Sequence, residues 1–124
     1  MEGKTLGEHR KFLVVDDSSF ARKMCGKSMH ELCPDAEIVE ACDGIEALKC
    51  ASDATFDLMI VDFNMPGDNG IEVAGKLKAI DADANIVLCT ANIQQGSRDS
   101  ASELGIGFIA KPINTEKLKQ YVSS

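Results

Sequence analysis

Residues 56–70 read FDLMIVDFNMPGDNG, which combines an apolar run, an acidic residue and a turn signal. Leu58 to Val61 are apolar at every position, which is typical of a strand buried on both faces of a parallel sheet. Asp62 follows directly, and Pro66 with Gly67 then predicts a turn. A single carboxylate therefore stands between a buried strand and a turn.

Four further short apolar runs indicate four further strands. They are Phe12–Val15, Ile38–Val39, Ile86–Cys89 and Ile106–Ile109. Between and after the strands, apolar residues recur at helical spacing. Helices are expected around residues 21–32, 45–51, 74–80, 93–104 and 118–122, with Gly105 ending the fourth and Asn114 or Thr115 starting the fifth.

Strand and helix thus alternate five times along the chain. Right-handed crossovers convert this order into a doubly wound α/β fold with a five-stranded parallel sheet and five helices. In such sheets the functional crevice lies beyond the carboxyl ends of the strands. The residues that follow each strand are therefore the candidates for chemistry.

The length and composition indicate one domain. A chain of 124 residues with 44% hydrophobic residues can bury a real core, and its apolar runs are too short to span a membrane. Residues 1–10 are polar and lack the apolar segment of a secretory signal. We therefore predict a polar leader over residues 1–10 and one domain over residues 11–124, located in the cytoplasm.

Charge and cysteine usage exclude two classes of function. The formal net charge of −7 argues against binding of nucleic acid, which requires a basic face for the phosphate backbone. The five cysteines are odd in number and include no C-x-x-C pair. A cysteine metal cluster or a disulfide framework is therefore not expected.

Four of the five strands end in residues with useful chemistry. Taken singly, each has an ordinary explanation, such as a solvated turn or a plain strand end. Together, at matching strand ends, they place three carboxylates, a hydroxyl and an ammonium in one crevice. Such a set suits Mg²⁺ and the transfer of a phosphoryl group. The residues are Asp16, Asp17, Asp62, Thr90 and Lys111.

This combination and its spacing resemble the receiver domain of two-component response regulators, over about residues 11 to 122. The single-domain chemotaxis type is the most similar. The resemblance implies a flavodoxin-like sheet with strand order 2-1-3-4-5. The matching motifs are Asp16-Asp17, Asp62 with Met65-Pro66-Gly67 and Gly70, Thr90-Ala91, and Lys111-Pro112.

The resemblance also implies roles at the site. Asp62 would accept a phosphoryl group from a histidine kinase. Asp17 would bind Mg²⁺ directly, Asp16 would support the ion through water, and Asn64 would contribute its backbone carbonyl. The domain would catalyse only its own phosphorylation and dephosphorylation, so it would not be an enzyme towards external substrates.

Three further residues would respond to phosphorylation. Thr90 would hydrogen-bond the phosphoryl group and move when it arrives, and Lys111 would pair with a phosphoryl oxygen. Phe108 would be the switch aromatic that rotates inward, and the bond between Lys111 and Pro112 is expected to be cis. A downstream protein would then dock on the fourth helix, fifth strand and fifth helix, roughly residues 93–104 and 108–121.

Three alternatives compete with this interpretation. An FMN-binding flavodoxin-like protein shares the sheet order, but Asp16 and Asp17 would repel the flavin phosphate. An aspartyl-phosphate phosphatase needs an acid two residues after its nucleophile, where this chain has Asn64. A receiver domain cut from a longer regulator stays open.

Overall fold

The computed structural model describes residues 10–65, 67–91, 99 and 102–122. Five parallel strands form one sheet in the order β2-β1-β3-β6-β7. Because β6 and β7 are the fourth and fifth strands of this sheet, the predicted order 2-1-3-4-5 is confirmed. The strands are β1 (Lys11–Val15), β2 (Glu37–Ala41), β3 (Leu58–Asp62), β6 (Ile86–Thr90) and β7 (Gly107–Ala110).

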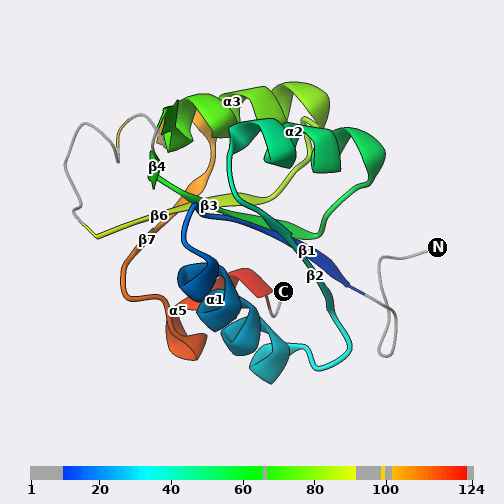
Figure 1. The fold of residues 1–124 in the computed structure, drawn as a ribbon, viewed down its shortest axis with the longest axis vertical. Helices are drawn as coiled ribbons and strands as arrows, with labels where there is room; N and C mark the ends of the chain where they lie inside the picture. Colours follow the sequence, from blue (N-terminus) through cyan, green and yellow to red (C-terminus); the bar gives the residue numbers. More distant parts are fainter. Residues whose placement is uncertain (1–9, 66, 92–98, 100–101, 123–124) are drawn as a thin grey trace.

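Helices cover both faces of the sheet, as a doubly wound fold requires. In Figure 1, α2 and α3 lie above the sheet, and α1 and α5 lie below it. Their bounds are α1 (Ser19–Leu32), α2 (Gly44–Asp53), α3 (Gly70–Ile80) and α5 (Thr115–Val122). Within the described ranges, no helix is long and apolar enough to cross a membrane.

The helix predicted over residues 93–104 falls largely outside the described residues. Asp99 and residues 102–104 are helical. Gly105 follows with a φ of 72°, and its N–H donates to the carbonyl of Ser102. The predicted glycine at the end of this helix is therefore confirmed.

A small antiparallel hairpin follows the central strand and was not predicted as strand. It consists of β4 (Asn64–Met65) and β5 (Asp68–Asn69). Gly67 lies between them with a φ of 76°, which confirms the turn expected there. Two-residue strands are too short to show a hydrophobic period, so the sequence could indicate only the turn.

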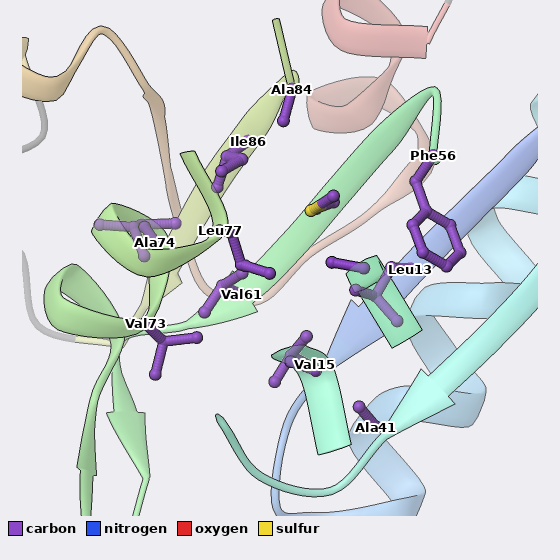
Figure 2. Packing of buried hydrophobic residues seen from close by; sticks show 14 of the residues in the cluster. Leu13, Val15, Ala41, Phe56, Val61, Val73, Ala74, Leu77, Ala84 and Ile86 are labelled. Atoms are coloured by element: carbon purple, nitrogen blue, oxygen red, sulfur yellow. The ribbon is translucent and has the colours of Figure 1, made fainter. Parts of the chain in front are cut away.

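Side chains alternate between two cores, one on each face of the sheet. One core, which includes Leu13, Val61 and Leu77, lies between the sheet and the helices α2 and α3 (Figure 2). The other core, which includes Phe12, Ile60 and Met29, lies between the sheet and the helices α1 and α5. All of β3 is buried, as predicted from the apolar run Leu58–Val61.

The carboxyl ends of neighbouring strands are joined by backbone hydrogen bonds. The N–H of Asp16 donates to the carbonyl of Ala41 at 3.1 Å. The N–H of Phe63 donates to Cys89 at 2.8 Å, and that of Lys111 donates to Thr90 at 2.7 Å. These bonds continue the parallel ladder one residue beyond the strands. They therefore fix the backbone from which the candidate side chains project.

Gly70, the first residue of α3, lies against the backbone at the end of β3. A Cβ atom on Gly70 would stand 2.6 Å from the carbonyl oxygen of Asp62 and 2.7 Å from Cα of Phe63. Since both atoms are backbone, they cannot move aside without shifting the site. Only glycine allows α3 to begin this close to Asp62.

We therefore predict that Gly70→Ala lowers the free energy of unfolding by about 1–3 kcal/mol, as overpacking does. Gly75→Ala in the same helix is the matched control, because its Cβ would meet nothing within 4 Å. The control should raise stability by about 0.5–1 kcal/mol. Urea unfolding of both variants is the measurement, and equal effects would contradict the close approach at Gly70.

Candidate functional site

Three carboxylates lie together at the carboxyl edge of the sheet. Asp16 and Asp17 follow β1, and Asp62 ends β3. Each offers an oxygen, and these oxygens lie within 4.8 Å of one another. Asp16 and Asp62 are 5% and 4% exposed, whereas Asp17 is exposed. The structure thus brings together the acidic residues that the sequence predicted for one crevice.

Hydrogen bonds fix the turn that carries Asp16. The N–H of Ser18 donates to Oδ1 of Asp16 at 2.9 Å, and Ser18 itself caps the start of α1. The guanidinium of Arg22 donates to the carbonyl of Asp16 at 2.7 Å and to Glu40 at 2.8 Å. Arg22 therefore joins this turn to β2. That role could not be predicted from the sequence, since an arginine on a helix usually lies in solvent.

Lys111 brings an ammonium group to the carboxylates from the loop after β7. Its Nζ lies 3.2 Å from Oδ1 of Asp62 and 3.4 Å from Oδ2 of Asp16. The side chain of Lys111 is 30% exposed, so the pairs are partly shielded from solvent. The peptide between Lys111 and Pro112 is cis, as expected.

The site perturbs the pKa of Asp62. Burial raises the pKa of this carboxyl above its ordinary value, and repulsion from Asp16 raises it further. The attraction and hydrogen bond of Lys111, and a hydrogen bond from the backbone of Asn64, oppose this rise without cancelling it.

The pKa of Lys111 is also raised. Burial lowers the pKa of this ammonium, but the attraction of Asp62 and Asp16 outweighs burial. The proton on Lys111 is therefore held firmly beside the two carboxylates.

Thr90, Asn64 and Phe108 surround this centre. Thr90 ends β6 and is fully buried, and the side-chain amide of Asn64 lies 3.5 Å from its hydroxyl. Phe108 is half-buried and pairs in register with Leu88. Since Thr90 is two residues beyond Leu88, Phe108 and Thr90 face the same side of the sheet. Their predicted roles, and the carbonyl role of Asn64, stay predictions.

A pocket of about 260 Å³ lies beside Asp16, on the side of the sheet that α1 covers. Asp16 and Lys111 line it together with apolar residues that include Met24 and Cys25. Phe20 also lines this pocket, and 74% of its surface is exposed. Phe20 could not be singled out from the sequence, because one aromatic residue in a helix forms no distinctive pattern.

The donor atoms fit a hard divalent cation. All three acidic residues offer oxygen, the ligand type that Mg²⁺ prefers. Three formal negative charges against the one ammonium of Lys111 leave two charges without compensation. A divalent ion would neutralise them, and Asp17 is exposed enough to reach one that keeps part of its water shell.

Comparison with known proteins agrees with this arrangement. The family model described as the response regulator receiver domain matches residues 12–123. The chemotaxis protein CheY of Halobacterium salinarum is 32% identical over 115 residues, which cover 92% of this chain and 94% of that protein.

Similar domains are also known as structures and as parts of longer proteins. The response regulator TrrA of Thermotoga maritima, solved in complex with Mg²⁺–BeF, is 35% identical with a TM-score of 0.80. The match covers 92% of this chain and 96% of TrrA. The sensor protein EvgS of Escherichia coli is 32% identical over 120 residues, which are 96% of this chain and 10% of EvgS.

The electrostatics of the site predict how Asp62 titrates. In magnesium-free buffer its carboxyl should titrate above the ordinary value of 3.8. Lys111→Met should raise the midpoint further because it removes the attraction of the ammonium, and Asp16→Asn should lower it because it removes a repulsion. Carbon-13 NMR of the aspartate carboxyls is the measurement. A midpoint that falls in Lys111→Met would contradict the pairing of these two residues.

Proposed function

Because the chain belongs to the response-regulator receiver family, we propose that it works as a switch in two-component signalling, with Asp62 accepting the phosphoryl group. Receiver domains are signalling switches rather than enzymes for external substrates. The main support for this proposal is that Nζ of Lys111 lies 3.2 Å from Oδ1 of the buried Asp62.

The proposed donor is the phosphohistidine of a histidine kinase. An oxygen of Asp62 attacks the phosphorus, the phosphorus–nitrogen bond breaks, and the histidine leaves as neutral imidazole because its other ring nitrogen has taken up a proton from water. The product is an aspartyl phosphate. Nucleophilic attack requires the ionised carboxylate, which the ammonium of Lys111 stabilises in this buried place.

Mg²⁺ is the proposed cofactor. Asp17 and Asp62 would hold it directly, Asp16 would support it through water, and Asn64 would offer its backbone carbonyl. The ion would neutralise charge on the phosphoryl oxygens during transfer. The hydrogen bonds around Asp16 fix the turn that carries two of these carboxylates, which would help to orient them towards the ion.

The proposed output begins at Thr90. Its hydroxyl would turn towards the phosphoryl group, and Phe108 would follow because both side chains lie on one face of neighbouring strands. A downstream protein would dock on the fourth helix, β7 and α5, roughly residues 93–104 and 108–121. Residues 93–98 and 100–101 of this face lie outside the described ranges.

An FMN-binding flavodoxin-like protein and an aspartyl-phosphate phosphatase both fit the site less well than a receiver domain. A flavin phosphate would meet the buried carboxylates of Asp16 and Asp62. A phosphatase would need a proton donor where the amide of Asn64 points to Thr90. The carboxylate and lysine arrangement therefore favours a receiver.

Asp62→Asn tests the acceptor directly, because it preserves the shape and removes the nucleophilic oxygen. Labelling by a phosphorylated histidine kinase or by acetyl phosphate should disappear. Asp53→Asn is the matched control, since Asp53 is exposed at the end of α2. Intact-mass spectrometry, which counts phosphoryl groups per chain, is the measurement.

The same assay tests the metal. Chelation of Mg²⁺ should abolish labelling of the unmodified chain, and added Mg²⁺ should restore it. Persistent labelling of Asp62→Asn, at the level of the Asp53→Asn control, would place the acceptor elsewhere and overturn the proposal.

A further inference from the structure

A second lysine, Lys117 in α5, contacts the loop that carries Lys111. Its Nζ donates to the carbonyl of Ala110 at 2.9 Å and to the carbonyl of Pro112 at 3.1 Å. These two carbonyls belong to the residues immediately before and after Lys111. One ammonium group therefore holds the backbone on both sides of the lysine that reaches Asp62.

The place of Lys117 in its helix is unfavourable for a cation. Asn114 caps α5, and its side chain accepts a hydrogen bond from the N–H of Lys117 at 2.8 Å. Lys117 thus lies in the first turn, where the helix dipole favours negative side chains. The two hydrogen bonds to carbonyls offset this cost. Lys117 therefore stabilises the loop rather than its own helix.

The loop is also held from the opposite side. The N–H of Lys111 donates to the carbonyl of Thr90 at 2.7 Å. Three consecutive residues, 110 to 112, therefore each have a backbone group bonded to β6 or to α5. A lysine side chain is long and flexible, so the position of its ammonium depends on how firmly its backbone is held.

Helix α5 itself is anchored without Lys117. Its residues Leu118 and Val122 are buried in the core between the sheet and the helices α1 and α5. The hydroxyl of Thr115 donates to Glu31 of α1, and Arg10 donates to the carbonyl of Val122. Loss of the Lys117 ammonium should therefore release the loop and leave the helix docked.

We propose that Lys117 is a positioning residue for phosphoryl recognition: by holding the carbonyls of Ala110 and Pro112, it keeps the ammonium of Lys111 over Asp62. This inference rests on the proposed function of Asp62 and Lys111. It adds a residue that does not itself touch the phosphoryl group.

Three variants of the full chain test the proposal. Lys117→Met keeps the length of the side chain and removes the donor, whereas Lys117→Arg keeps a donor that can reach two carbonyls. Lys76→Met on α3 is the control for the change in charge, because Lys76 is exposed. Urea unfolding establishes that each variant is folded before it is assayed.

Two readouts are measured on each variant. Amide hydrogen exchange at Lys111 should become about tenfold faster in Lys117→Met, because the loop opens without unfolding of the domain. Binding of beryllofluoride with Mg²⁺, a mimic of the phosphoryl group, should weaken about tenfold, since a misplaced ammonium loses a charge-assisted contact. Lys117→Arg should recover most of both effects, and Lys76→Met should match the unmodified chain.

The outcomes separate the inference from the proposed function. Unchanged exchange at Lys111 and unchanged mimic binding in Lys117→Met, with normal binding by the unmodified chain, would overturn the role of Lys117 alone. If the unmodified chain does not bind the mimic, the proposed function and this inference both fail. Equal acceleration of exchange throughout α5 would show that Lys117 only anchors the helix, which also overturns the inference.

Discussion

Uncompensated negative charge at one edge of the sheet is the constraint on which the site depends. Three carboxylates have oxygens within 4.8 Å of one another, and Lys111 supplies one ammonium between two of them. Two unit charges at that separation interact by about 3–4 kcal/mol at a surface-like effective dielectric. A parallel sheet brings such groups together because its strand ends share one edge. The excess negative charge is complementary to a divalent cation, whereas the ammonium of Lys111 is the group complementary to an anionic phosphoryl oxygen.

The surrounding structure keeps these groups from moving apart. Arg22 joins the Asp16 turn to β2, Gly70 lets α3 begin against the backbone of Asp62, and the bonds around Lys111 fix its loop. Each contact comes from a different element, so the site is held from several sides. A rigid edge of this kind can transmit a local change, because the packed strands behind it do not deform continuously.

The sequence predicted the sheet and the clustered site because both follow from strong local patterns. Leu58–Val61 is apolar at every position, and Asp62, Thr90 and Lys111 follow strands whose order fixes where they meet. It missed the β4–β5 hairpin, whose strands are too short for a period. It also missed Arg22 and Lys117, because the groups that they bind, three backbone carbonyls and the carboxylate of Glu40, become their neighbours only in the folded chain.

As a switch, the domain must change a distant surface when a phosphoryl group is added to Asp62. Amide chemical shifts of the unmodified chain, recorded with Mg²⁺ before and after addition of beryllofluoride, are the measurement for this change. We expect shift changes at Phe108 and along α5 as well as at the site, because Thr90 and Phe108 share one face of the sheet. Changes confined to the loops around Asp17, Asp62 and Lys111 would contradict this expectation.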